Sequence, residues 1–274
     1  MLEAILARLS AQPSRTGALI ITLYGDAIAP RGGVLWLGTL LAVFRAAGVR
    51  DGVVRTACSR LAADGWLLRA RRGRNSFYAL APRGQAETEA AAPRIYGPLS
   101  PPWDGRMHLA VLEVASRETA REALAAAGWG AAGPLLMVGS TAAPPPPGAL
   151  LLTAAADTAT LQRLAARAWP LEEAGERYRQ FLATFPEHPG ETTGVDALIA
   201  RMLVVQEYRR AALRDPHLPE GLLPPDWPGR TARARAASLY AALMPASEAW
   251  LDAEARNEAG PLPPADPAKA RHFL

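Results

Sequence analysis

The sequence predicts an α+β fold in three parts, and three observations lead to this expectation. Segments with apolar residues at helical spacing alternate with short apolar runs of the length of strands. Proline-rich stretches separate these patterns, and the net charge differs strongly between the two ends of the chain. The 274 residues give room for two domains and a third small one. We expect an N-terminal domain over 1–90, a central domain over 105–168 and a helical domain over 169–274.

The N-terminal part contains three helix-like segments in close succession. Apolar residues recur at helical spacing from Leu19 to Tyr24, and a second helical pattern covers Leu35 to Ala47. After a turn at Gly48–Arg50, a third helix is expected from Asp51 to Asp64, with the Asp51 carboxylate as its N-cap. The residues expected on its buried face are Val54, Cys58 and Leu61. The last two helices form a helix-turn-helix arrangement.

A basic hairpin is expected directly after the third helix. The segments Trp66–Arg72 and Ser76–Leu80 are typical of strands, and Gly73–Asn75 between them is typical of a turn. The hairpin holds four arginines and no acidic residue. Such a hairpin after a helix-turn-helix is a wing, so we interpret residues 1–90 as a winged helix-turn-helix DNA-binding domain.

This arrangement predicts contacts with double-stranded DNA. Side chains of the third helix can read base edges in the major groove, while arginines of the hairpin contact phosphates. The candidate residues on the helix are Arg55, Thr56, Ser59 and Arg60. Those on the hairpin are Arg69, Arg71, Arg72, Arg74, Asn75, Ser76 and Tyr78. A winged helix that binds only protein is an alternative. Because one helix reads few base pairs, a homodimer on an inverted repeat is expected, although the sequence does not indicate which surface pairs.

Charge supports a polyanionic partner for the N-terminal part. Residues 1–94 hold 13 Arg and 6 Asp or Glu, a net charge of +7, whereas residues 95–274 carry −3. Cys58 is the single cysteine, which excludes an internal disulfide and a multi-cysteine zinc site, and we expect it to be a buried thiol. No apolar run is long enough to span a bilayer and no signal peptide is evident, so a cytoplasmic protein without membrane contact is expected.

The middle of the chain predicts a small α/β unit. Prolines from Ala90 to Asp104 indicate a linker. Beyond it, a β-α-β-β-α order fits a ferredoxin-like domain over 105–168, although a fourth strand is not visible. The strand-like runs are Met107–Val114, Leu135–Val138 and Leu150–Thr153, and the helical ones are Arg117–Ala127 and Ala159–Trp169. The Pro144–Pro147 tract is either a stiff loop or a polyproline ligand. Further helices are expected at Leu171–Phe185, Val195–Leu213 and Thr231–Leu243.

Four segments together resemble the PaaX family of transcriptional regulators. They are LIITLYGDAIAPRGG (19–33), VVRTACSRLAADGWL (53–67), RAWPLEEAGERYRQFLATF (167–185) and YRRAALRDPHLPEGLLPPDWPG (208–229). The resemblance touches all three parts of the chain. It implies a dimeric repressor of aromatic-acid (phenylacetate) catabolism genes, released by an acyl-CoA effector such as phenylacetyl-CoA. The chain departs from the family pattern at Gln206, where a His is common, and at Val138–Ser140, which leaves the effector open.

Two interpretations of the C-terminal arginines stay open. Arg209, Arg210 and Arg214 either anchor the phosphates of an acyl-CoA, or form a buried salt-bridged knot with Asp215. The aromatic residues that an aryl group would stack on are Trp169, Tyr178 and Tyr208. These three aromatics and the three arginines are the candidate ligand-binding residues.

The sequence favours no enzyme. It has no phosphate-binding loop, no dinucleotide fingerprint and no His-Glu-x-x-His helix, and its four histidines are scattered. A nuclease with a ferredoxin-like domain is an alternative, but Glu113 is a single carboxylate at the expected strand end, too few for a divalent cation. We therefore expect no catalytic residue, no metal and no cofactor.

Overall fold

A computed structural model describes residues 16–98, 100–269 and 273. Within these residues the fold is α+β, with three antiparallel sheets. Contacts group the chain into two compact units. The first unit comprises the residues up to Gly97, Gln180–Leu213 and the residues from Thr231 onward, and the second comprises Pro98–Arg179 and Arg214–Arg230. This grouping differs from the three parts expected from the sequence, and residues 1–15 of the expected domain 1–90 lie outside the described residues.

The first unit begins with a helix that changes its winding. Helix α2 (Thr16–Leu23) continues into the π-helical turn η2 (Tyr24–Ile28) and the 3-10 turn η3 (Ala29–Arg31). Strand β1 (Val34–Trp36) then leads into α3 (Leu37–Ala46). The first two residues of the helix expected from Leu35 are therefore extended, because β1 adds to the sheet formed by the hairpin. A π-helical turn is rare and is often found at functional sites.

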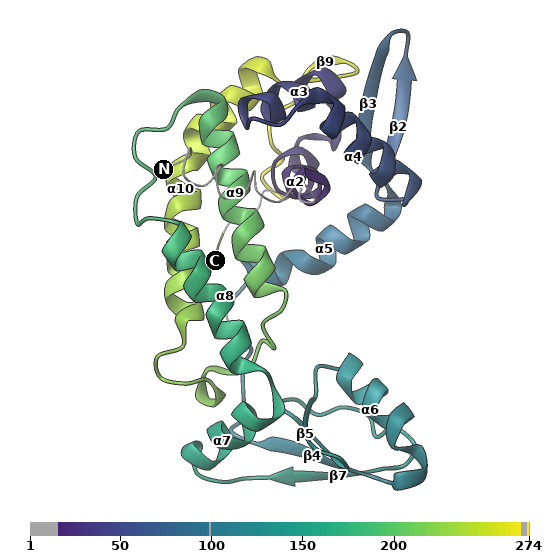
Figure 1. Ribbon diagram of the computed structural model, residues 1–274, viewed down its shortest axis with the longest axis vertical. Coiled ribbons are helices and arrows are strands. Elements are labelled where there is room, and N and C mark those ends of the chain that lie inside the picture. The colour runs from purple at the N-terminus through teal and green to yellow at the C-terminus, as the bar shows by residue number, and fades with distance from the viewer. Residues whose placement is uncertain (1–15, 99, 270–272, 274) are drawn as a thin grey trace. The chain divides into compact units, whose positions relative to one another are not determined.

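Helix α4 and the hairpin follow the sequence expectation closely. Gly48 (φ 76°) closes the turn before α4 (Asp51–Ala63), and Gly65 (φ 73°) follows it. Strands β2 (Leu67–Arg72) and β3 (Asn75–Leu80) pair in register, and β1 completes a sheet in the order β1-β3-β2. The hairpin extends beyond α4 (Figure 1). The N-cap expectation for Asp51 is wrong, because Asp51 is already helical and its carboxylate accepts a hydrogen bond from Arg45 at 2.7 Å.

The linker expected from Ala90 is helical for half of its length. Helix α5 runs from Pro82 to Tyr96 and includes Pro93. A proline inside a helix removes one backbone donor. Here the burial of Ala92, Ile95 and Tyr96 offsets that cost, and Arg94 Nη2 donates to the carbonyl of Ala212. The irregular segment therefore begins only at Gly97.

The C-terminal helices belong largely to the first unit. Helix α9 (Gly194–Ala212) runs beside α2 and also packs on α3 and α5 (Figure 1). It is buried on nearly every side, as expected of a central core helix. Helix α8 spans Leu171–Thr184, and α10 spans Pro228–Glu254, longer than the expected Thr231–Leu243 because it continues through Pro245. A short hairpin of β8 (Arg256–Asn257) and β9 (Gly260–Pro261) follows.

The second unit contains a four-stranded antiparallel sheet in the order β5-β6-β4-β7. Its elements are β4 (Met107–Leu112), the 3-10 turn η4 (Val114–Ser116), α6 (Arg117–Ala126), β5 (Gly130–Gly133), β6 (Leu136–Gly139), β7 (Ala149–Ala154), α7 (Thr158–Ala168) and η5 (Glu220–Leu222). The fourth strand, which the sequence pattern did not predict, is β5. Its Gly-Ala-Ala-Gly sequence has no strand preference of its own. It is formed by pairing with β6.

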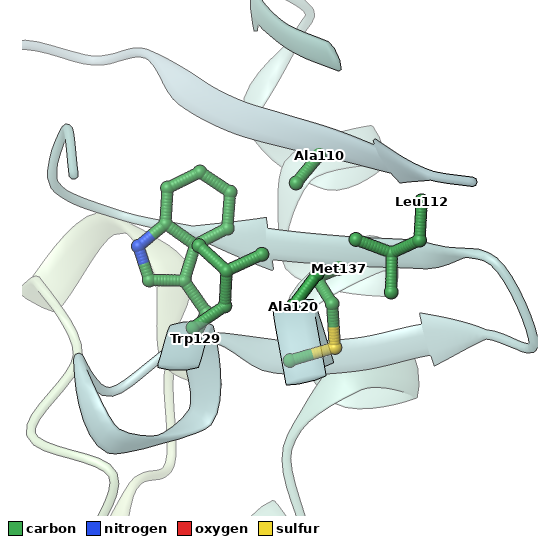
Figure 2. Packing of buried hydrophobic residues seen from close by; sticks show 6 residues of the cluster. Ala110, Leu112, Ala120, Trp129 and Met137 are labelled. Atoms are coloured by element: carbon green, nitrogen blue, oxygen red, sulfur yellow. The ribbon is translucent and has the colours of Figure 1, made fainter. Parts of the chain in front are cut away.

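Figure 2 shows the core on one face of this sheet. Ala110 and Leu112 of β4 pack with Met137 of β6, with Trp129 and with Ala120 of α6. Gly139 has no side chain, which lets the Trp129 ring lie against the strand, because a Cβ there would come within 2.5 Å of the indole. The opposite face carries Val111 and Leu136. The sheet therefore holds hydrophobic residues on both faces.

A buried ion pair is the main polar feature of the first unit. Arg201 of α9 is 2% exposed and donates from Nε to Asp26 Oδ2 of η2 at 2.8 Å. The hydroxyls of Tyr96 and Tyr240 donate to the other oxygen of Asp26 at 2.8 and 2.9 Å. Burial disfavours the charge of Arg201, but Asp26 and Glu248 outweigh this and raise the pKa of the guanidinium above its ordinary value. One carboxylate thus joins η2, α5, α9 and α10.

A second arginine extends this network. Arg31, which is 2% exposed, donates to Glu248 and Asp252 of α10, and Glu248 also accepts from Arg201. Arg201 Nη1 donates to Ser247 as well. Burial is the main cause that raises the pKa of the Tyr96 hydroxyl, and the negative charge of Asp26 raises it further. This hydroxyl therefore stays protonated and donates its hydrogen bond. We call Asp26, Arg31, Arg201 and Glu248 together the buried ion network.

Replacing Arg201 with Met should lower the free energy of unfolding by about 3 to 5 kcal/mol, because Asp26 is left buried without its cation. The matched control is Arg177→Gln, which removes an exposed pair with Glu173 and should cost less than about 1 kcal/mol. Urea denaturation of both variants measures the difference. Equal losses in the two variants would contradict a structural role for the buried pair.

Candidate nucleic-acid interface

Helix α4 separates its side chains into a buried face and an exposed face. Val54 and Cys58 are fully buried, and Leu61 is partly buried. Burial raises the pKa of the Cys58 thiol to about 11, so the thiol stays protonated. The candidate residues Arg55, Thr56, Ser59 and Arg60 are on the other face, and all four are exposed. Within the described residues, Arg55 and Arg60 have no acidic partner, which leaves both guanidinium groups available to an external anion.

The hairpin presents some of its candidate residues and buries others. Arg71, Arg72, Arg74 and Asn75 are exposed at its end. Ser76 and Tyr78 are only 8% and 4% exposed, because β3 lies between β1 and β2, so the sequence interpretation of their side chains as DNA contacts does not fit their burial. Ser76 Oγ instead accepts from Arg69 Nη2 at 3.0 Å and orients that arginine.

The C-terminal hairpin β8–β9 contacts this region, which the sequence did not suggest. Glu258, in the turn of this hairpin, accepts from Arg72 Nε at 2.6 Å. The backbone N–H of Arg256 donates to Thr39 of α3 at 3.2 Å. The Asn257 and Gly260 turn residues were the available signal for a hairpin. Glu258 therefore neutralises one of the four hairpin arginines in the free protein.

The six candidate ligand-binding residues are divided between the two units. Trp169, Tyr178 and Arg214 belong to the second unit, and Tyr208, Arg209 and Arg210 to the first. The three aromatic side chains are buried. Trp169 donates to the carbonyl of Gly128, Tyr178 donates to Asp215 at 2.8 Å, and Tyr208 packs edge-on against Phe181. These contacts make the aromatics part of the core.

The described contacts of Arg209, Arg210, Arg214 and Asp215 differ from the salt-bridged knot, which was one of the two interpretations left open by the sequence. Arg209 donates to Thr22 at 2.8 Å, Arg210 pairs with Glu207, and Arg214 is exposed. Asp215 accepts from Tyr178 and from the backbone N–H of His217, whose φ of 57° this contact supports. Asp215 thus stabilises the proline-rich turn through a tyrosine and an amide. Among the described residues, Arg31 and Arg201 are the arginines buried in ion pairs, and no sequence pattern marked either of them.

Neither a metal cluster nor a membrane span is found in the described part of the chain. Over residues 16–98, 100–269 and 273, no three His, Cys, Asp or Glu side chains are grouped so that they could hold a metal ion. Within the same ranges, no helix has both the length and the apolar character needed to cross a membrane.

Comparisons with known proteins find related sequences and a related fold. The model of the PaaX-like protein family matches residues 15–84, and the model of the PaaX-like protein C-terminal domain matches residues 169–253. The solved structure of the uncharacterized protein Rv0674 from Mycobacterium tuberculosis is similar in fold, with a TM-score of 0.52 and 22% identity, over 77% of this chain and 89% of that one.

A curated relative extends the sequence similarity over nearly the whole chain. It is the transcriptional repressor PaaX of Escherichia coli strain K12, which is 35% identical over 279 residues, covering 93% of this chain and 88% of the relative. The two family models match the helices and hairpin of the first unit and the helices that hold the buried ion network. The chain belongs to the PaaX family of transcriptional regulators.

Proposed function

We propose that this protein is a DNA-binding transcriptional repressor without catalytic activity. The observation that carries the proposal is the exposed polar and basic face of α4 beside an arginine-rich hairpin. In this arrangement α4 enters the major groove and the hairpin contacts the neighbouring phosphates. The printed function of the Escherichia coli relative, a transcriptional repressor, supports the same conclusion.

In this proposal the first unit contains a winged helix-turn-helix. Helices α3 and α4 with the Gly48 turn are the helix-turn-helix, and β2–β3 is the wing. The sheet of the second unit has the strand order of a ferredoxin-like domain, which supports that assignment. One connection differs from the β-α-β-β-α-β order of a ferredoxin-like domain. The connection from β6 to β7 is a proline-rich loop, and the second helix, α7, follows β7. The Pro144–Pro147 tract in that loop supports the stiff-loop interpretation.

Family membership supports genes of phenylacetate catabolism as the target, with release by an acyl-CoA effector. Only the resemblance supports this effector, and the candidate residues Trp169, Tyr178 and Tyr208 are poor stacking surfaces because they are buried. Addition of phenylacetyl-CoA to a complex with operator DNA tests the effector assignment. Dissociation would support it, and a complex that persists at millimolar thioester would exclude this ligand.

Changing Ser59 and Arg60 of α4 to Ala should weaken binding to the selected operator by about 1 to 3 kcal/mol for each base pair that these side chains read, and should change binding to random DNA much less. Gel-shift titrations on the two DNA types, after selection of the operator from random sequences, measure the ratio. An equal drop in affinity on both DNA types would show that α4 contacts only phosphates.

Changing Arg71 and Arg74 of the hairpin to Ala should weaken binding to all sequences and lower the slope of affinity against salt by about 1 for each arginine that binds a phosphate. Arg72 is left unchanged because its replacement would also break the ion pair with Glu258. The control is Arg179→Ala, an exposed arginine of α8 paired with Glu176. If the salt slope of the double variant matched that of the control, the hairpin would not be a wing.

We also propose a homodimer that pairs through β7, one of the two edge strands of the sheet in the second unit. Strand β7 carries no charge, proline or bulge that would protect an edge, and Leu150 and Leu152 are 64% and 55% exposed. Changing both leucines to Lys should convert the dimer to a monomer and weaken binding to an inverted repeat. Light scattering after gel filtration measures the mass, and a variant that stays dimeric would place the interface elsewhere.

A further inference from the structure

The arginines of the β2–β3 hairpin lie on two different faces of its sheet. Successive side chains of a strand point to opposite faces, and residues directly opposite each other on paired strands share a face. Arg69 is opposite Tyr78, and Arg71, two residues further along β2, is on the same face. Arg72 is opposite Asn75 and belongs to the other face. Its side chain therefore points away from those of Arg69 and Arg71.

The face that carries Arg69 is the one beside α4. Burial raises the pKa of the Tyr78 hydroxyl on this face, and the positive charges of Arg69 and of Arg55 in α4 act against that rise, so the hydroxyl lies near α4. A DNA duplex that binds to α4 therefore approaches the hairpin from the side of Arg69 and Arg71. Arg72 is turned away from this side.

Arg72 is instead joined to the C-terminal hairpin β8–β9. Its Nε donates to Glu258 Oε2 at 2.6 Å, and both side chains are partly exposed. Among the residues that the structure describes, no other side-chain hydrogen bond or ion pair joins the hairpin end, 71–75, to the rest of the protein. Glu258 is thus placed to hold the end of a hairpin that extends beyond α4 (Figure 1).

The C-terminal hairpin is itself attached to the first unit at its base. The N–H of Arg256 donates to Thr39 of α3 at 3.2 Å. Leu262, just after β9, is buried, and the carbonyl of Pro263 accepts from Arg31 Nη1 at 3.0 Å. Arg31 is a member of the buried ion network, so the turn of this hairpin is held from the core of the first unit.

We propose that Glu258 is a positioning residue of the β2–β3 hairpin, which acts on DNA binding through Arg72. The ion pair holds the hairpin end where Arg71 and Arg74 meet phosphates, and Arg72 makes no DNA contact of its own. In this respect the role of Glu258 rests on the proposed function. A hairpin that is already held in the free protein loses less conformational freedom on binding, so it binds DNA more tightly than a loose one. The strength of an exposed ion pair limits the effect to about fivefold in affinity.

Gel-shift titrations of the full chain at several salt concentrations, on the selected operator and on random DNA, test this role. Glu258→Gln and Arg72→Gln should each weaken binding about two- to fivefold. The double variant should bind no more weakly than either single one, because both changes remove the same contact. The salt slope of Arg72→Gln should fall by much less than the value of about 1 that loss of a phosphate contact gives. Exchanging the two charges, Arg72→Glu with Glu258→Arg, should restore affinity to within about twofold, because the pair forms again at the same net charge.

Glu254→Gln is the matched control. Glu254 is the last residue of α10, is exposed, and has no cation partner among the described residues. Its replacement removes one negative charge from the same part of the chain. Tighter DNA binding by Glu258→Gln than by this control would overturn the positioning role, because Glu258 would then be competing with phosphate for Arg72. A salt slope that falls by about 1 in Arg72→Gln would overturn it as well.

Hydrogen exchange in the free protein separates this role from the proposed function. The amides of 69–78 should exchange faster in Glu258→Gln than in Glu254→Gln, because the hairpin end opens more often without its support. Equal exchange rates in the two variants would overturn the role of Glu258. Failure of the unchanged protein to bind any DNA would contradict the proposed function, and the exchange rates would still decide whether Glu258 holds the hairpin.

Discussion

The Asp26–Arg201 ion pair is the interaction on which the first unit depends. Asp26 belongs to η2, which precedes α3 and α4, and Arg201 belongs to α9, 175 positions later in the chain. Both side chains are almost fully buried, so each charge is tolerated only while the other is in place. The hydroxyls of Tyr96 and Tyr240 complete the partners of Asp26. This geometry holds η2, α5, α9 and α10 together in one compact unit.

The arginines of this protein divide into two groups by their surroundings. Arg31 and Arg201 are buried and paired with carboxylates, and they stabilise the fold. Arg55, Arg60 and Arg74 are exposed, and within the described residues they have no acidic partner. An exposed arginine without a partner is free to bind phosphate, whereas a buried paired one is not. The same residue type therefore supports both the fold and the proposed DNA interface, and burial separates the two roles.

Sequence patterns predicted the elements that depend on local preference. Helix α4, the Gly48 and Gly65 turns and the β2–β3 hairpin all form where apolar periodicity and turn residues indicate them. Elements that depend on partners were missed. Strand β5 is a Gly-Ala-Ala-Gly segment that exists because β6 pairs with it, and β1 is extended because β3 is beside it. Helices α5 and α10 continue through Pro93 and Pro245 because buried residues lie on either side of each proline. No local sequence rule predicts that burial.

The sequence by itself determined the α+β class and the order of basic and polar residues along α4 and the hairpin, because these follow from composition and local spacing. The family came from the resemblance of four segments to known sequences. The tertiary structure alone decided which arginines are buried, that Ser76 and Tyr78 are covered, and that α9 and α10 belong with the N-terminal helices. It also brought Glu258 to Arg72 and placed Arg209 against Thr22, with no carboxylate partner among the described residues. The reason is physical, since burial and ion pairing depend on distances between residues far apart in the chain.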